Sequence, residues 1–576
     1  KAMPSITPMM SAIWRDDSSG RYEYPKMVSD IQSKYAGAAE IKSNFMIVNG
    51  GTIAPGNSPG TLTVGGLSLL SGSVLNYELN TANVAGGLTN DLIVDTGNLT
   101  LYGTLNVTTT GGFGLGVYQI VNYAGTLTNN ILNVGTLPGT FSGFIQTSIA
   151  NQVNLIVTAP GVMVQDWQGA DTVGNGINDG GTGTWDAAST NWSATPYGLN
   201  TNWQSGVAVF GGATGTVTVS GTQNFQGLQF ATDGYLLTGG TLNASNPAFI
   251  SVGAGLGAGI ASDVTGGSIV KQGAGEIGLG GNNSFASLDV QAGTVGVFST
   301  TALGAGTATF AGGTTLFTGV TGLAVANAIT LTSGSVDVDT NGLNIALTGV
   351  VSGAATLNKI GTGFLSLTNA NTYSGNTTLN NGGIAVGNNS ALGTGSLTMG
   401  PSTLLVALSS VTLANDVTLI GGDTISTNGF DLTLNGTVGG LGTLNKAGAG
   451  TLTLNGTNTY GATVVQAGTV NAGNANALGA GQVTMLAGTT LQAGGSFTLA
   501  NNILLESSLT FLGLGVDPLT PSWGGMLADG RNYLQTAWWV SVFPGLAIMC
   551  CVLGLNLLGD ALNQALSPRR REGASA

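Results

Sequence analysis

The stretch "NKAGAGTLTLNGTNTYGATVVQAGTVNAGNANALGAGQVTM", Asn445 to Met485, decides the fold of this chain. Apolar and polar residues alternate in it over short runs, which is the period of a strand with one buried face. Gly, Asn and Asn-Gly separate the runs, and these residues favour turns with positive φ. Because no long 3.6-residue periodicity is present, we expect strands joined by tight turns rather than helices.

Two further copies of this stretch precede it, one beginning at Asn358 and a weaker one at Val270. Each copy has a lysine, an aromatic residue 14 positions later and an Ala-Leu-Gly motif further on. The members are Lys271, Lys359 and Lys446, then Phe285, Tyr373 and Tyr460, then the motifs centred on Leu303, Leu392 and Leu478. We interpret the evenly repeated lysines as solvated edge charges that discourage end-to-end pairing of strands.

Stacked coils explain these repeats better than a sandwich or a propeller does. Thr, Asn, Val, Leu and Gly recur at equivalent places over hundreds of residues, as ladders between neighbouring coils require. At roughly 20 residues per coil, residues 44 to 505 would form about 23 coils. The sequence therefore predicts an all-β solenoid.

The composition excludes several classes of protein. Charged residues make up only 7% of the chain, yet 42% of its residues are apolar, which argues against disorder. Three lysines, no arginine and sixteen acidic residues lie between residues 43 and 505. A nucleic acid is therefore not an expected partner, because binding to phosphates needs a basic surface.

The residues of the common catalytic sites are also missing. The chain contains no histidine, which removes Ser-His-Asp and Cys-His machinery and the usual zinc sites. It has no Gly-Lys-Ser or Gly-Lys-Thr loop for phosphates, and its glycine runs are explained by solenoid turns. The two cysteines, Cys550 and Cys551, are neighbours in an apolar run and predict packing rather than redox chemistry. We expect a non-enzymatic protein without a cofactor or a metal ion.

Paired carboxylates leave one enzymatic alternative open, a polysaccharide-active β-helix. Asp337 and Asp339 alternate onto one face of a predicted strand, and Asp423 and Asp431 are candidates across the following turns. The favoured interpretation is that these are solvated carboxylates on the outer face.

A second candidate site combines indole rings with acidic residues. Exposed indoles stack on sugar rings and carboxylates hold Ca²⁺, so a glycan-contact patch is one interpretation, and a tryptophan core is the favoured one. The residues are Trp167, Trp185, Trp192 and Trp203 with Asp166, Asp171, Asp179 and Asp186.

The repeats resemble the passenger-associated repeats of bacterial autotransporters. "GGTIAPGNSPGTLTVGG" (Gly50–Gly66) is similar to a signature of such passengers, and "GTGTWDAASTNWS" (Gly181–Ser193) to segments of the longer ones. The resemblance covers about 460 residues. It implies a right-handed parallel β-helix at the cell surface or outer membrane, commonly adhesive, with a host-surface or glycan ligand. No signal peptide or outer-membrane barrel is recognised, and we expect a further piece upstream.

The last 70 or so residues have a different character. Residues 537–559 are mostly apolar and long enough for a transmembrane helix, with Trp538 and Trp539 at their start, as in an interfacial aromatic belt, and Arg569 to Arg571 after them. "ILLESSLTFLGLGV" (Ile503–Val516) and "PSWGGMLADGRNYL" (Pro521–Leu534) resemble the C-terminus of the permease subunit of dipeptide and oligopeptide ABC transporters.

This second resemblance implies contact with the lipid bilayer of the inner membrane, and a transport role only with partner subunits. Because the third repeat stops where the permease-like sequence begins, near residues 503–506, we interpret the chain as a chimera of two coding segments. The locations that its two parts imply conflict with each other.

Five parts follow from these observations. They are 1–44, unassigned; 45–160, a β-solenoid with the "GTIAPGNSPGTL" signature; 161–245, a Trp/Asp/Gly-rich β segment; 246–505, the repeats; and 506–576, the permease-like tail. The expected function is that of a surface or adhesion passenger, and the alternatives are a membrane component of a peptide transporter and a polysaccharide-active enzyme.

Overall fold

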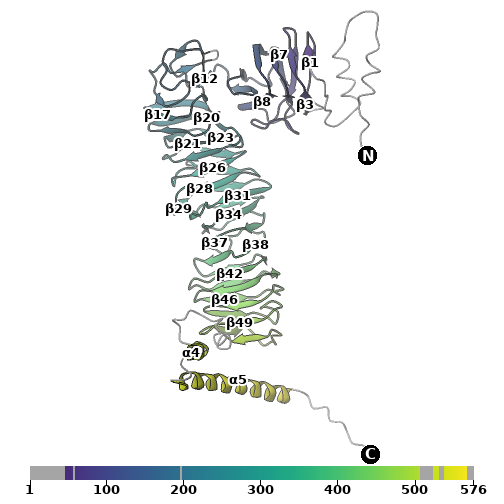
Figure 1. The fold of residues 1–576 in the computed structure, drawn as a ribbon, viewed down its shortest axis with the longest axis vertical. Coiled ribbons are helices and arrows are strands. Elements are labelled where there is room, and N and C mark those ends of the chain that lie inside the picture. Colours follow the sequence, from purple (N-terminus) through teal and green to yellow (C-terminus); the bar gives the residue numbers. More distant parts are fainter. Residues whose placement is uncertain (1–45, 56–58, 195–196, 506–522, 531–536, 567–576) are drawn as a thin grey trace, which may run out of the picture. The chain divides into compact units, whose positions relative to one another are not determined.

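The computed structural model describes residues 46–55, 59–194, 197–505, 523–530 and 537–566 (Figure 1). The expected segment 1–44 and much of the predicted tail lie outside these residues. The chain divides into two compact units: unit 1 extends to Ala258 and includes Ile269–Gly275, and unit 2 comprises Gly259–Ser268 and the chain from Glu276 onward.

The first part of unit 1 consists of two sheets with mostly parallel strands. They follow the orders β1-β4-β7-β5-β2, with β9 beside β7, and β10-β11-β8-β6-β3. Among the described strands of this part, β10 and β8 pair antiparallel with β11, and Leu79 and Asn90 form an isolated antiparallel bridge. The bounds are β1 (Met46–Val48), β2 (Thr52–Ile53), β3 (Thr61–Val64), β4 (Leu67–Leu69), β5 (Val74–Glu78), β6 (Leu92–Asp95), β7 (Leu99–Thr108), β8 (Gly116–Tyr123), β9 (Leu127–Val134), β10 (Ser142–Gln146) and β11 (Gln152–Thr158).

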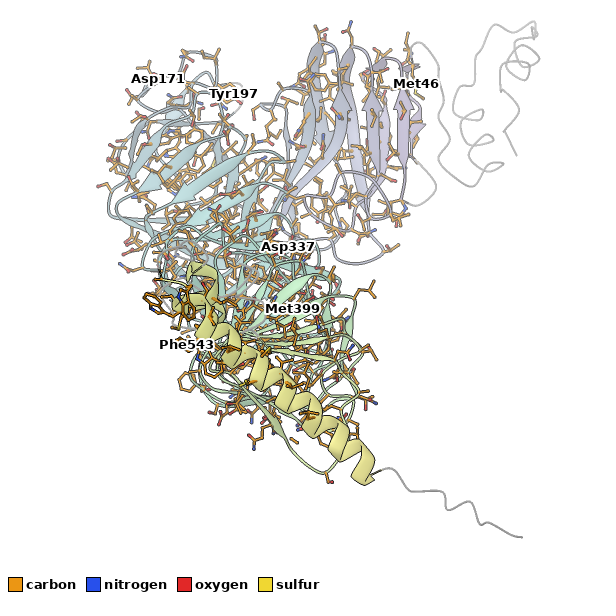
Figure 2. The ribbon with its side chains drawn as sticks, turned by 60° about the horizontal axis from the view of Figure 1, so that its bottom comes forward. Met46, Asp171, Tyr197, Asp337, Met399 and Phe543 are labelled. Carbon is orange, nitrogen blue, oxygen red and sulfur yellow. The ribbon has the colours of Figure 1, made fainter. Side chains whose placement is uncertain are left out.

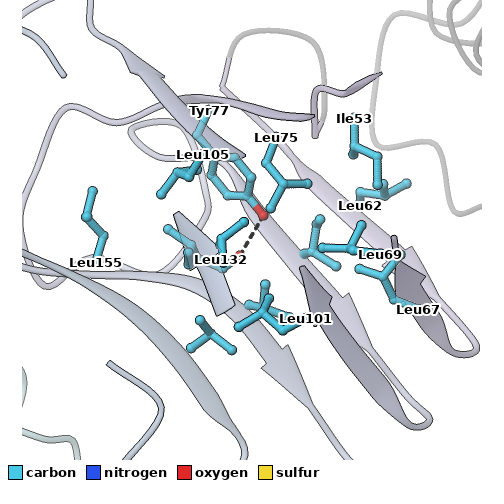
Figure 3. Close-up of a cluster of buried hydrophobic side chains, with 14 of the residues drawn as sticks. Ile53, Leu62, Leu67, Leu69, Leu75, Tyr77, Leu101, Leu105, Leu132 and Leu155 are labelled. Atoms are coloured by element: carbon cyan, nitrogen blue, oxygen red, sulfur yellow. Dashed lines mark hydrogen bonds between the residues drawn. The ribbon is translucent and has the colours of Figure 1, made fainter. Parts of the chain in front are cut away.

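The core between these sheets consists largely of leucines (Figure 3). Along β7, buried and half-buried residues alternate, as expected for a strand with one face inside. Tyr77 lies fully buried in this core, and its hydroxyl donates a hydrogen bond of 2.8 Å to the carbonyl oxygen of Ile120. The polar tip of the ring is thereby satisfied without solvent.

The rest of unit 1 begins with a small antiparallel group and continues with parallel strands. β15, β14 and β12 pair antiparallel, and β12-β16-β18-β20-β23 and β13-β17-β19 follow in parallel order. The bounds are β12 (Val164–Trp167), β13 (Gly183–Trp185), β14 (Trp192–Ser193), β15 (Asn200–Thr201), β16 (Val207–Phe210), β17 (Thr216–Val219), β18 (Thr222–Phe230), β19 (Tyr235–Thr238), β20 (Thr241–Val252) and β23 (Ser268–Gln272). β21 (Gly257–Ile260) and β22 (Asp263–Gly266) fall at the boundary between the units in the sequence.

Unit 2 is a stack of parallel coils, each made of short strands (Figure 1). One sheet, here called the front sheet, contains β24 (Glu276–Leu279), β26 (Thr294–Val297), β28 (Thr315–Thr318), β31 (Ser335–Asp339), β34 (Thr356–Ile360), β36 (Thr377–Leu379), β38 (Leu397–Met399), β41 (Val417–Leu419) and β44 (Val438–Gly440). A second sheet contains β29 (Leu323–Val325), β32 (Ile345–Leu347), β35 (Phe364–Leu367), β37 (Gly383–Val386), β39 (Leu404–Ala407), β42 (Gly422–Ser426), β45 (Thr443–Ala447), β47 (Thr463–Val465), β49 (Val483–Met485) and β51 (Ile503–Leu505).

Two shorter series complete the coils of unit 2. One is β25 (Ser287–Val290), β27 (Ala308–Phe310), β30 (Ile329–Leu331) and β33 (Val351–Gly353), and the other is β40 (Val411–Leu413), β43 (Leu432–Leu434), β46 (Thr451–Leu454), β48 (Thr469–Ala472) and β50 (Thr490–Ala493). Leu288 pairs with Ala308, Ala308 with Ile329, and Ile329 with Val351, so successive coils take 20 to 22 residues.

The predicted all-β solenoid is therefore confirmed, with about 22 turns in place of the 23 expected. The right-handed sense of the winding stays a prediction.

The sequence repeat is not a whole number of coils. Lys359 lies on β34 of the front sheet, and four further coils lead along that sheet to β44. Lys446, the equivalent lysine of the next repeat, lies one strand later, on β45 of the second sheet. Each repeat thus advances by four coils and one strand, which moves its equivalent residues to the neighbouring sheet.

The described part of the tail consists of two helices, α4 (Trp523–Gly530) and α5 (Trp539–Leu566). They contact each other, for example where Gly530 lies against Ser541. α5 contains Pro544, and apolar residues along it are exposed, with Phe543 at 64% and Leu557 at 60%. Among the residues that the structure describes, none of the helices has the length and apolar character needed to cross a membrane. The predicted transmembrane segment is therefore not confirmed.

Candidate functional site

The three repeated lysines are buried, which corrects their interpretation as edge charges. Lys271, Lys359 and Lys446 have no exposed surface. Nζ of Lys359 donates hydrogen bonds to the carbonyl oxygens of Ile360, Gly361 and Asn381 at 2.8, 2.7 and 3.1 Å. Lys446 makes the corresponding three bonds, and Lys271 also donates to three carbonyls. The lysine occupies an inward position of its strand, where its three donors match the carbonyls of the turn.

A buried asparagine ties three coils together in each repeat. In the second copy, Oδ1 of Asn371 accepts a hydrogen bond from the Val351 amide at 2.8 Å, and Nδ2 donates to the Ala391 carbonyl at 2.7 Å. Asn283 and Asn458 make the equivalent pair of bonds in the other copies. One side chain thereby pairs buried backbone groups in the coils before and after its own, which would otherwise lose hydrogen bonds.

The repeated aromatic residue and the Ala-Leu-Gly motif form one contact. Tyr373 is fully buried, and its hydroxyl lies 2.7 Å from Oγ1 of Thr377. Gly393 has a φ of 62°, and a methyl group there would lie 3.1 Å from the Tyr373 ring. The residues that define the repeat are therefore used to hold the coils together.

The four tryptophans of the proposed glycan-contact patch lie in the interior of unit 1. Trp167, Trp185 and Trp192 have no exposed surface, and Trp203 is 6% exposed. The ring centroids of Trp192 lie 5.0, 4.9 and 4.5 Å from those of Trp167, Trp185 and Trp203, respectively. Rings packed in this way act as a core and offer no free face on which a sugar could stack.

The acidic residues near this cluster bind their own turns. Asp171 accepts hydrogen bonds from the amides of Val173 and Gly174, and Asp186 from those of Ala188 and Ser189. Asp179 accepts a hydrogen bond from the side-chain amide of Asn175. Within the described residues, no group of three or more His, Cys, Asp or Glu side chains is arranged to hold a metal ion.

Asp166 is the exception, because it is buried. Nδ2 of Asn178 donates to its carboxylate at 3.3 Å. Burial raises the pKa of Asp166 to about 7, although the nearby hydroxyl groups of Ser148 and Tyr197 act to lower it. The described residues of unit 1 include one lysine, Lys271, which is bound to backbone carbonyls, so no cation has been placed beside this carboxyl group.

The four candidate acids do not come together. Asp337 and Asp339 lie two residues apart on β31 of the front sheet, and both are half-buried on its outer face. Asp423 lies on β42 of the second sheet and is fully buried, with its carboxylate accepting from the amides of Thr403 and Gly421. Asp431 is exposed just before β43 and accepts from the Thr451 amide. Only Asp337 and Asp339 remain as neighbours.

Two phenylalanines lie on the front sheet beside these two acids. Phe298 follows β26 and is 43% exposed, and Phe317 on β28 is half-buried. Their ring centroids are 5.8 Å apart and their planes are perpendicular. Methyl groups at Gly278 and Gly296 would lie 2.9 and 3.0 Å from the Phe298 ring, and one at Gly319 would overlap it. These glycines allow the ring to lie directly on the backbone of the sheet. We call Phe298 and Phe317 the aromatic platform.

Strand pairing places the acids next to the aromatic platform. Phe317 pairs with Asp339 and Thr315 with Asp337, one coil further along. Asp337, labelled in Figure 2, accepts a hydrogen bond from Nδ2 of Asn358 at 2.8 Å. One oxygen of Asp339 accepts a hydrogen bond of 2.7 Å from the backbone N–H of Asn341. The outer face of β26, β28 and β31 therefore combines rings, a hydroxyl group and two oriented carboxylates.

Sequence reasoning identified Asp337 and Asp339 but missed the aromatic platform. The available signal was a phenylalanine at an outward position of an alternating strand, with glycine at the equivalent position of the preceding strand, as in "EIGL" and "TVGV" before "TLFT". Glycine in a strand interior often marks a close approach of another group.

The fold and the buried repeat residues define a parallel β-solenoid built from sequence repeats. The family described as passenger-associated-transport-repeat matches residues 269–297, 357–386 and 444–472. Over 367 residues, the chain is 36% identical to the "Adhesin BmaC autotransporter" of Brucella suis biovar 1 (strain 1330). The aligned region covers 60% of this chain and 10% of that protein. The predicted resemblance to autotransporter passengers is confirmed.

A separate segment is similar to permeases. The chain is 51% identical over 84 residues to the di/tripeptide transport system permease protein DppC of Pseudomonas aeruginosa (strain UCBPP-PA14), which covers 15% of this chain and 27% of that protein. It is 49% identical over 77 residues to the dipeptide transport system permease protein DppC of Escherichia coli (strain K12), covering 13% and 26%. This resemblance was also predicted. The chain thus spans about a tenth of the adhesin and about a quarter of the permeases, and no solved structure matches it significantly.

Proposed function

We propose that the solenoid is a non-enzymatic passenger segment of the adhesion type, displayed at the bacterial cell surface or outer membrane. The observation that carries this proposal is the use of the repeat residues. The buried lysine, asparagine and aromatic side chains hold the coils together, and the outer faces are left for recognition. The similarity to an autotransporter adhesin supports the same function, and a right-handed winding is part of the proposal.

Binding to host cells tests this function. Fluorescently labelled full-length chain should bind saturably to the surface of cultured epithelial cells, and excess unlabelled chain should displace it. Heat-unfolded chain at the same concentration is the control for non-specific adsorption. Absence of saturable binding to any of a panel of cell types and glycans would contradict the adhesive function.

The enzymatic alternative is weaker because its candidate acids are dispersed. Asp423 is buried on the second sheet and Asp431 precedes β43, so neither lies beside Asp337. We expect no release of reducing sugar from polygalacturonate or other plant and bacterial polysaccharides. Turnover that is lost in Asp337→Asn or Asp423→Asn would instead establish an enzyme.

For the tail we propose a permease-derived segment that contacts lipid through residues 537–559. Its similarity to DppC proteins and the exposed apolar side chains of α5, such as Phe543 and Leu553, support this role. Full-length chain should then co-float with phosphatidylglycerol vesicles, and Leu553→Glu should reduce the bound fraction. A transport role would need partner subunits and an inner-membrane location.

The junction itself has a direct test. Mass spectrometry of the natural source should detect a peptide that spans Asn501 to Leu512 if the two segments are expressed as one chain. If only peptides on either side are found, the passenger and the permease segment belong to separate products.

A further inference from the structure

We propose that the aromatic platform, together with Asp337 and Asp339, binds an uncharged hexose ring of a glycan. This inference rests on the proposed adhesive function and names the surface and ligand class through which it acts. The site comprises Phe298, Phe317, Thr315, Asp337 and Asp339, which strand pairing brings together from three successive coils.

The stacking surface is open and preorganised. With 43% of its surface exposed, Phe298 presents apolar area to solvent beside the half-buried Phe317. The ring is wedged against Gly278, Gly296 and Gly319, so it loses little conformational freedom when a ligand binds. The apolar C–H face of a pyranose covers an aromatic ring of this kind and removes its area from water.

The carboxylates provide orientation for the hydroxyl groups of the sugar. Asn358 holds one oxygen of Asp337, and the Asn341 amide holds one oxygen of Asp339. The second oxygen of each has no hydrogen-bond partner among the described side chains and backbone groups. Ionised carboxylates accept strong hydrogen bonds, so two fixed acceptors beside the rings suit a pair of sugar hydroxyls.

Charge decides which sugars are accepted. Asp337, Asp339 and the exposed Glu276 are the acidic groups of the outer face of the front sheet, and Asp339 also interacts electrostatically with the buried Lys359. Within the described residues of unit 2, Lys359 and Lys446 are both buried and donate to backbone carbonyls. A sialic acid or a uronic acid would be repelled, because no cation is available to pair with its carboxylate. The ligand is therefore a neutral hexose unit rather than an acidic one.

The test compares glycans and matched variants of the full-length chain. A glycan array, followed by calorimetry with the best neutral oligosaccharide, should show binding that the sialylated or uronic acid analogue lacks. Phe298→Ala and Phe317→Ala should each weaken binding by about tenfold or more, and Phe298→Tyr, which keeps a ring, should retain it. Asp337→Asn and Asp339→Asn should weaken binding by a smaller factor.

Two variants elsewhere on unit 2 are the controls. Phe430 is 40% exposed outside the site, and Asp431 is an exposed carboxylate on another face. Phe430→Ala and Asp431→Asn should bind as the unaltered chain does, and circular dichroism should show that every variant is folded.

The outcomes separate this inference from the proposed function. If the chain adheres to cells but the Phe298→Ala and Phe317→Ala variants adhere equally well and no neutral glycan binds, the site assignment is overturned and adhesion stands. Preference for acidic glycans, or binding to a protein receptor that the variants leave intact, also overturns it. If neither cells nor glycans bind the folded chain, both proposals fail.

Discussion

The glycine of each Ala-Leu-Gly motif lies against the aromatic residue of the preceding coil. In Gly393→Ala, the added methyl would crowd the ring and carbonyl oxygen of Tyr373 in a backbone with a φ of 62°. We expect a loss of about 2–4 kcal/mol in the free energy of unfolding, measured by urea denaturation. Gly429→Ala is the matched control, since Gly429 has a φ of 86° but open space around it. Equal losses at both positions would show that backbone strain, and not the ring contact, explains the motif.

The buried lysine gives a second prediction for a single residue. Lys359→Met keeps the length of the side chain but removes the donors to three carbonyls. The carbonyls of Gly361 and Asn381 lose the hydrogen bonds from Lys359, whereas that of Ile360 keeps those from Thr340. Because an unsatisfied buried acceptor costs about 1–3 kcal/mol, we expect the thermal midpoint to fall clearly. Gln466→Met, at an exposed position, should leave it unchanged. An unaltered midpoint in Lys359→Met would mean that water reaches these carbonyls.

At the scale of elements, the alternation of residues predicted the strands and their stacking but not every side chain's direction. Leu365 and Leu367 are buried on β35, as a strand with period two requires. Lys359 breaks the rule that charges face outward, because its long stem reaches the carbonyls of the next turn, and alternation alone carries no information about such a partner. Likewise, Phe298 was missed because the glycines beneath it act across coils and not along the sequence.

Coils that contact only their neighbours should be removable as units. Thr377 pairs with Leu397 and Ile384 with Leu405, so deletion of residues 377–396 removes one coil and brings equivalent residues into register. We expect this variant to fold with an unchanged type of circular dichroism spectrum and a modestly lower midpoint. Deletion of residues 377–386 should prevent folding, because it moves every later strand to another face. A folded half-coil variant would contradict the ladder described here.

At the scale of the whole molecule, sparse charge makes the few buried ionisable groups decide how stability depends on pH. In unit 1, burial raises the pKa of Asp166 to about 7 and that of Asp91 to about 6. A raised carboxyl pKa stabilises the fold at low pH, and this stability is lost as the pH rises through 6 to 7. The urea concentration at the denaturation midpoint, followed by tryptophan fluorescence, should decrease as the pH is raised from 5 to 8. Asp166→Asn should flatten that fall, and an unchanged slope would mean that Asp166 is not the titrating group.

Unit 2 should respond in the opposite direction above about pH 8, because two of its buried ionisable groups, Lys359 and Lys446, are lysines. Burial lowers the pKa of Lys359 and of Lys446 to about 8, below the value of 10.5 in the unfolded chain. The unfolded state therefore binds more protons between about pH 8 and pH 10.5, and the stability of unit 2 rises with pH across that window. Far-UV circular dichroism should show a higher urea midpoint at pH 9.5 than at pH 7.5. The double variant Lys359→Met, Lys446→Met should be less stable at both pH values and should lose the increase in urea midpoint. If the urea midpoint of the unaltered chain instead falls from pH 7.5 to 9.5, the three carbonyls stabilise each ammonium group more than burial penalises it.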